Sequence, residues 1–145
     1  MRVDELLAET RALFHTLTEW SDALHAELRI GAAMRGVLEV LLLRGPATVP
    51  NMARARGVSR QHIQQQVDAL LERDLLERRN NPAHRRSSMF ALSDKGRALI
   101  QNMRAEELKA LSRMQVGVSD YSALEAAQVL SAWRTAFRRD LTSRL

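Results

Sequence analysis

The sequence of 145 residues contains no cysteine. Without thiols the chain can form no disulfide, no thiolate metal cluster and no cysteine redox sensor. Long apolar runs are also missing, since the longest is Val40–Leu43 with its neighbours, whereas a membrane span needs ~18 to 20 such residues. The first residues, Met1–Glu9, are polar and acidic and do not resemble a secretion signal. We therefore expect a cytoplasmic protein.

Patterns that serve catalysis or metal binding are absent as well. The histidines at positions 15, 25, 62 and 84 show no HxxxH or similar spacing, which argues against a metal site. The sequence has no glycine-rich phosphate loop, no nucleophile elbow and no paired carboxylates beside a base. We therefore expect no cofactor and no enzymatic activity, and we look for a binding function.

Residues 48–96 have the pattern of a helix, a tight turn, a second helix and a β-hairpin. Thr48 is placed to cap the first helix, which ends at Arg56, and Gly57 begins the turn. Ser59 is a suitable N-cap for a second helix that runs to about Arg73. Two short runs of strand type, 75–79 and 88–92, flank a basic loop. This order is that of a winged helix-turn-helix.

Positive charge is concentrated on the same segment. From Arg44 to Arg97 there are eleven basic and five acidic residues, a net charge of +6, whereas the rest of the chain has a net charge of −1. A surface that displaces counterions from phosphates needs such an excess. The segment is therefore predicted to bind DNA.

Amphipathic helices are expected on both sides of this segment. Apolar residues recur at helical spacing over Val3–Leu28, and Ala32–Leu43 is apolar on most sides, as in a buried helix. Ser93 should cap a long helix that runs to about Val116. Ser122 and Glu125 form a capping box, which predicts the start of the last helix.

The sequence resembles the MarR family of bacterial winged-helix transcriptional regulators. The stretch "ARARGVSRQHIQQQVDALLERDLLERR" is similar to the family's helix-turn-helix, and "HRRSSMFALSDKGRALI" to its wing and following helix. The resemblance implies a mainly α fold of α+β type, with a β-hairpin wing. It also implies a homodimer in which the N- and C-terminal helices form the dimerisation platform. We expect one domain, with a DNA-binding lobe at about 33–98 and a helical dimerisation region at about 1–30 and 99–145.

Three positions depart from the family pattern. His84 stands where the wing usually has an aspartate, so the acidic partner of the wing arginine, Arg86, is missing. Gln65 occupies a position that is often arginine, which removes one charge near the phosphates. Asp74 replaces the usual glycine before the first wing strand, but aspartate tolerates a left-handed backbone better than most residues.

Candidate DNA contacts follow from this layout. Glutamine can pair with adenine, and arginine with guanine or with phosphate. An arginine on a hairpin tip suits a narrow minor groove. For each side chain the alternative is an ordinary solvated surface. The candidates are Ser59, Arg60, Gln61, Gln64 and Gln65 on the recognition helix, His84, Arg85 and Arg86 on the wing, and Arg54, Arg56, Arg78 and Arg79 for phosphates.

A small-molecule site is a further hypothesis. His15, Trp20, Arg29 and Arg35 lie on or near the first two helices, which in this family help to line an effector cleft. A cation beside an aromatic ring would suit a small aromatic or anionic effector. Alternatively, Trp20 is a core or dimer contact and the basic side chains are surface groups.

The resulting prediction is a sequence-specific regulator of transcription that binds double-stranded DNA. We expect a ligand-responsive repressor, active as a homodimer on a near-palindromic operator. The alternative is a protein-binding module, an anti-activator or adaptor that has lost specific DNA recognition. The altered wing and Gln65 permit that alternative, but the charge of the segment argues against it.

Overall fold

The computed structural model describes residues 2–145, and the chain divides into two compact units, residues 1–111 and 112–145. The first unit holds five α-helices, one 3₁₀ turn and three short strands, and the second holds a single helix. The elements are α1 (Val3–Leu24), η1 (Ala26–Leu28), α2 (Ala32–Arg44), β1 (Ala47–Thr48), α3 (Val49–Arg56), α4 (Arg60–Glu72), β2 (Leu76–Arg79), β3 (Met89–Leu92), α5 (Asp94–Ser112) and α6 (Asp120–Ser143). None of the helices in residues 2–145 is both long and apolar enough to cross a lipid bilayer.

The helix-turn-helix forms for local reasons that the sequence predicts. The Thr48 hydroxyl accepts a hydrogen bond from the Asn51 N–H at 3.3 Å, and the Ser59 hydroxyl accepts one from the His62 N–H at 3.1 Å. Between the two helices Gly57 has φ of 69°, a left-handed conformation that glycine adopts without steric cost. Both predicted caps and the predicted turn are thus confirmed.

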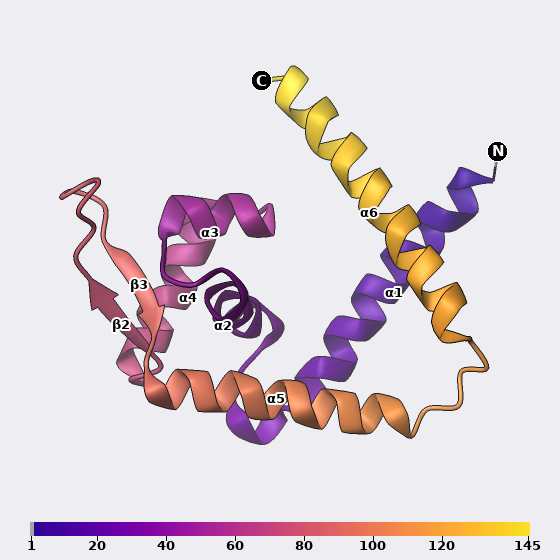
Figure 1. The fold of residues 1–145 in the computed structure, drawn as a ribbon, viewed down its shortest axis with the longest axis horizontal. Coiled ribbons are helices and arrows are strands. Elements are labelled where there is room, and N and C mark those ends of the chain that lie inside the picture. Colours follow the sequence, from indigo (N-terminus) through magenta and orange to yellow (C-terminus); the bar gives the residue numbers. More distant parts are fainter. Residues whose placement is uncertain (1) are drawn as a thin grey trace. The chain divides into compact units, whose positions relative to one another are not determined.

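The wing is an antiparallel hairpin of β2 and β3, and β1 extends it to three strands in the order β1-β3-β2. Leu76 pairs with Leu92 at the base of the hairpin, and Arg79 pairs with Met89 near its tip. The two-residue strand β1 was not predicted, because two residues are too few to show an alternating pattern. In Figure 1 the hairpin loop projects away from α4.

The base of the wing is fixed to the start of α5. Ser93 donates its hydroxyl to the Asp74 carbonyl at 2.6 Å and accepts a hydrogen bond from the Gly96 N–H at 2.9 Å. A Cβ at Gly96 would overlap the Leu75 carbonyl, so only glycine allows this approach. Asp74 has φ of 57°, which confirms the left-handed turn expected there.

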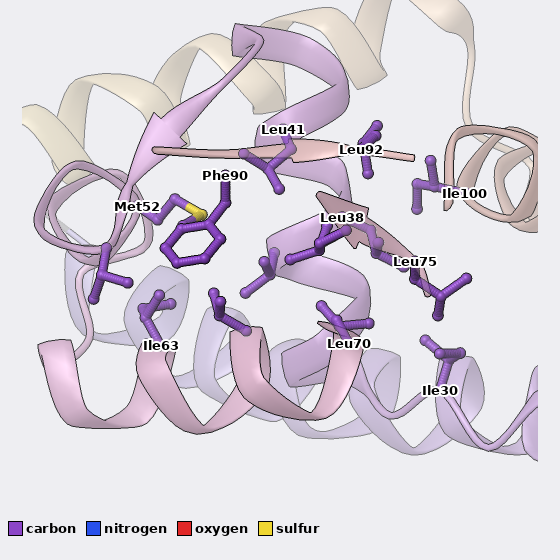
Figure 2. Packing of buried hydrophobic residues seen from close by; sticks show 14 of the residues in the cluster. Ile30, Leu38, Leu41, Met52, Ile63, Leu70, Leu75, Phe90, Leu92 and Ile100 are labelled. Atoms are coloured by element: carbon purple, nitrogen blue, oxygen red, sulfur yellow. The ribbon is translucent and has the colours of Figure 1, made fainter. Parts of the chain in front are cut away.

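One hydrophobic core holds these elements together. It contains side chains from α2, α3, α4, the sheet and α5, and Figure 2 shows Leu38, Ile63, Leu70 and Phe90 pointing into it. Leu38 and Leu70 are fully buried. On α4 the buried residues are Ile63, Val67 and Leu70, the inward stripe that the sequence predicts.

Three predicted helix boundaries are wrong. The first helix ends at Leu24 rather than Leu28, because the chain turns through η1 and through Arg29 at φ of 51°. The helix after the wing ends at Ser112 rather than Val116, before a segment with Gly117 at φ of 69°. The last helix begins three residues earlier than expected, because Ser119 rather than Ser122 is the N-cap.

Candidate nucleic-acid interface

Helix α4 and the wing meet around one open hollow. Its lining includes three recognition-helix candidates, Arg60, Gln61 and Gln64, together with Arg78 of β2 and Arg86 of the wing loop. The rest of the lining is Val49, Pro50, Ser87, Ser88 and Phe90. The hollow therefore brings together five predicted contact residues from three separate parts of the sequence.

Two of these side chains are held by neighbours. The Gln64 amide donates a hydrogen bond to the Asp68 carboxylate, one turn further along α4, at 2.8 Å. The Arg78 guanidinium carbon lies 5.6 Å from the centre of the Phe90 ring, within the range of a cation–π contact. Both contacts restrict side chains that would otherwise move freely, while leaving their remaining hydrogen-bonding groups exposed.

Other predicted contacts lie outside the hollow. Gln65 is exposed on α4, and Ser59 is exposed directly before this helix, where its hydroxyl is the N-cap. His84 and Arg85 are exposed in the wing loop. Turns organise that loop, since the His84 N–H donates to the Asn81 carbonyl at 3.2 Å and the Ser87 N–H donates to the His84 carbonyl at 3.2 Å. In the described chain no carboxylate pairs with Arg86, in line with His84 replacing the usual acid.

The predicted phosphate contacts have different surroundings. The Arg79 guanidinium lies 3.7 Å from the Glu77 carboxylate on the same strand, and the Arg54 guanidinium donates a hydrogen bond to the side-chain oxygen of Asn51. Arg56 differs from both, because its guanidinium lies against the backbone of Gly36 on α2. It therefore lines a second hollow inside the first unit.

The second hollow, of about 250 Å³, lies among α1, α2, α3 and α5. Trp20 and Arg35 line it, as the sequence analysis predicts for an effector site, whereas His15 and Arg29 do not. His15 is exposed on α1 beside Phe14, and the Arg29 carbonyl accepts a hydrogen bond from Arg73 at 2.8 Å. The remaining lining residues are Phe14, Leu17, Thr18, Ser21, Ala32, Gly36, Arg56, Glu107 and Leu111.

Arg35 is part of an ion-pair network on one side of this hollow. Its guanidinium binds both carboxylate oxygens of Glu107, with Nε at 2.5 Å from Oε1, and it donates to Glu39 at 2.9 Å. The buried His25 contributes a further contact, with Nε2 at 3.0 Å from the Glu107 carboxylate. Glu107 thus joins the segment after α1 to α2 and α5.

The network shifts the pKa values of its members. The hydrogen bond to Glu107 raises the pKa of Arg35 above its usual value, although burial opposes this. Burial alone would raise the pKa of Glu107, but the hydrogen bonds from Arg35 and His25 outweigh it and hold this pKa below its usual value. Both groups are therefore charged at neutral pH. Glu107 was not predicted, since it is one of several acids on α5 and no spacing distinguishes it from the others.

Comparisons with known proteins agree with this geometry. A family model described as the MarR family matches residues 35–87. An uncharacterised protein of Mycobacterium tuberculosis is 36% identical over 81 residues, which span 56% of this chain and 56% of that protein. The chain thus matches little more than half the length of this relative.

Solved structures match over nearly the whole chain. The crystal structure of the MarR family transcription regulator SP03579 is 28% identical, with a TM-score of 0.79 over 99% of this chain and 95% of that one. A Staphylococcus aureus MarR in complex with salicylate and kanamycin is 16% identical, with a TM-score of 0.80 over 96% and 94%. The predicted winged helix-turn-helix with long flanking helices is confirmed.

Proposed function

We propose that this chain, which matches the MarR family model over residues 35–87, is a regulator of transcription of that family that binds double-stranded DNA through α4 and the wing. The observation that carries the proposal is the hollow in which Arg60, Gln61 and Gln64 of α4 face Arg78 and Arg86 of the hairpin. The net positive charge of the protein also lies around this cluster, since residues 44–97 have a net charge of +6 and the rest of the chain has a net charge of −1.

The side chains divide by role. Gln61 and Gln64 lie near the N-terminal end of α4, the part of a recognition helix that reaches base edges in the major groove. Arg86, on the exposed wing loop and without a carboxylate partner in the described chain, suits the minor groove. Arg78 is held beside Phe90 in a position to bind phosphate. We assign base recognition to the amides and non-specific affinity to the arginines.

A homodimer is the form in which we expect the protein to act. Helix α6 has no buried residue, and large apolar side chains are exposed on α1 and α6. Such continuous apolar faces usually mark an interface. They include Leu13, Phe14 and Leu17 of α1, and Leu124, Val129, Leu130, Phe137 and Leu141 of α6. A two-fold dimer would present two recognition helices ~34 Å apart to a near-palindromic operator.

We further propose that the protein represses transcription and that a small ligand controls this repression. The hollow beside Trp20 is lined by helices of the DNA-binding lobe and by α1, so a ligand there could change the position of the lobe. The S. aureus protein of similar fold was solved with salicylate, an aromatic acid. A dimer on its operator would then block transcription by occupying the promoter until the ligand binds.

The test is a binding titration on the DNA upstream of the protein's own gene, at two salt concentrations and with random duplex as competitor. We expect saturable binding that survives the competitor and weakens steeply with salt. Size measurements with light scattering on the same sample should give a dimer. A protein-binding adaptor would instead show no preference for the upstream duplex, and that result would contradict the proposed function.

A further inference from the structure

The two glutamines that line the hollow between α4 and the wing have different neighbours one helical turn further on. Four residues after Gln61 the chain has a third glutamine, Gln65, whereas four residues after Gln64 it has an acid, Asp68. Residues four apart on a helix are neighbours on its surface. The Gln64 Nε2 donates a hydrogen bond to the Asp68 Oδ1 at 2.8 Å. The amide of Gln64 therefore has a charged support that a glutamine cannot give to Gln61.

The chemistry of this pair fixes which way the Gln64 amide faces. A free glutamine side chain can turn either its NH₂ group or its oxygen toward a neighbour. An ionised carboxylate accepts hydrogen bonds but donates none, so it binds the NH₂ group. The reverse orientation would bring the amide oxygen against a carboxylate oxygen. The oxygen of the Gln64 amide is therefore left on the side away from Asp68, where it is available to a donor on DNA.

A glutamine that presents its oxygen selects bases with an amino group in the major groove. Adenine and cytosine carry such a group, whereas guanine and thymine present acceptor oxygens at the corresponding position. The carboxylate repels the amide oxygen, so it binds the N–H that points away from that oxygen, and the second N–H remains beside the oxygen. An oxygen and an N–H side by side match the N6 amino group and the N7 acceptor of adenine. Cytosine offers the amino group without that second acceptor.

We propose that Asp68 is a positioning residue that holds the Gln64 amide in the orientation that recognises adenine, and thereby sets the base pair that the protein selects at one position of its DNA site. Asp68 acts through Gln64, since it does not itself line the hollow. The inference rests on the proposed function, because it concerns the specificity of the same DNA-binding surface. It also gives a reason for an acid on α4, where a negative charge otherwise lowers the affinity for every duplex alike.

The variants separate the orientation of the amide from the charge of residue 68. Asp68→Asn has nearly the same shape, but its amide both donates and accepts, so it can bind Gln64 in either orientation. Asp68→Glu keeps the carboxylate and adds one methylene. Glu72→Gln is the matched control, because it removes the same charge from an exposed position of α4 that lies ~12 Å along the helix axis from Gln64. Circular dichroism melts establish that each variant is folded.

The first measurement selects binding sites for the full-length protein from duplexes with a randomised segment of about 20 base pairs, enough for two half-sites one helical turn apart. The position that Gln64 recognises is the one at which Gln64→Ala loses its base preference. There we expect the wild type to select an A·T pair and Asp68→Asn to accept the four base pairs more evenly. Asp68→Glu and Glu72→Gln should select as the wild type does.

The second measurement is fluorescence anisotropy on two duplexes, the selected site and the same site with a G·C pair at that position in one half-site. The ratio of the two dissociation constants measures discrimination. We expect a ratio of about tenfold for the wild type, Asp68→Glu and Glu72→Gln. In Asp68→Asn the ratio should be about threefold lower, because a charge-assisted hydrogen bond between neighbours on a helix no longer holds the amide. Affinity for random duplex should rise in Asp68→Asn and Glu72→Gln alike, since each removes a negative charge.

An unchanged ratio in Asp68→Asn would overturn the proposal, as would a G·C pair selected by the wild type or a Gln64→Ala variant that keeps every base preference. An equal loss in Glu72→Gln would assign the effect to charge, and an equal loss in Asp68→Glu would show that a carboxylate is not what matters, so each also contradicts it. If the wild type enriches no sequence at all, the proposed function is wrong and the inference fails with it. Failure in the variants alone contradicts the inference and leaves the proposed function in place.

Discussion

Helices α4 and α6 both have an apolar stripe at helical spacing, but only one of these stripes is covered within the chain. On α4 the stripe residues Ile63 and Val67 are 1% and 0% exposed. On α6 the exposed fractions of Leu124 and Leu141 are 59% and 62%. Periodicity therefore indicates which face of a helix is apolar, but not which surface covers it. For α4 the cover is the core of the lobe, and for α6 we expect a second copy of the chain.

Removal of α6 is the most severe test of this comparison. A chain that ends at Tyr121 lacks Leu130, Trp133, Phe137 and Leu141, each of which contributes ~1.5 to 3 kcal/mol where it is fully buried. We expect this chain to be monomeric or aggregated, as measured by light scattering. A stable truncated dimer that still binds DNA would place the interface elsewhere and would leave the α6 stripe without an explanation.

Single substitutions in the core of the lobe and in the α6 stripe should also behave differently. Leu38→Ala in the core should lower the free energy of unfolding by ~2 to 5 kcal/mol at every protein concentration, because it leaves a cavity inside the chain. Leu141→Ala on α6 should have an effect that depends on protein concentration, because it acts on association. Denaturant titrations at two concentrations check this. A concentration-independent loss in Leu141→Ala would show that α6 is covered by its own chain.

Substitutions on the polar face of α4 and in the wing should have a smaller effect, on the affinity for DNA. Gln61→Ala or Gln64→Ala should cost ~1 to 3 kcal/mol on the operator and little on random duplex, since amides read bases. Arg78→Ala should weaken binding to both duplexes and reduce the salt dependence. Competition titrations on the two duplexes measure the contrast. Equal losses on both for the glutamine variants would mean that this face of α4 does not recognise sequence.

Local signals in the sequence predict the DNA-binding lobe well. The helix caps at Thr48 and Ser59 bind backbone N–H groups three residues later, and the turn depends on the backbone conformation of Gly57 itself. Because these signals are local, the sequence pattern is enough to place both helices and the turn. The predicted starts of the two wing strands, at residues 75 and 88, each lie one residue before the observed starts at Leu76 and Met89, because residues of strand type on either side of a turn are also a local signal. Asp74 shows that a departure from the family pattern can keep the backbone geometry of the glycine it replaces.

Contacts between distant residues were beyond the reach of the sequence. The first helix ends before His25, whose ring contacts a carboxylate 82 residues away, and nothing in the local pattern indicates that pairing. In the same way, Arg56 is one of several arginines in a basic segment, and its place against Gly36 depends on how α2 and α3 pack. The glycine at position 36, in the interior of α2, is a local sign of that contact.

The smallest expected effect concerns Glu107 of α5, whose carboxylate contacts Arg35 of α2 and His25, which follows α1. Hydrogen bonds from Arg35 and His25 hold its pKa in the folded protein below the 4.5 of an unperturbed glutamate. A carboxyl group whose pKa is lower in the folded state stabilises the fold above the unfolded pKa and loses this contribution as the pH falls through the folded one. We therefore expect no contribution of Glu107 to pH dependence between pH 7 and 5, and a loss of stability below about pH 4.5. Thermal melts of the wild type and Glu107→Gln from pH 7 to 3 measure it, because the other titrating groups largely cancel in the difference between the two proteins. The wild type should be the more stable at pH 7, and the difference should shrink as the medium becomes acidic. A difference that stays constant down to pH 3 would show that the charge of Glu107 does not hold α5 to α2.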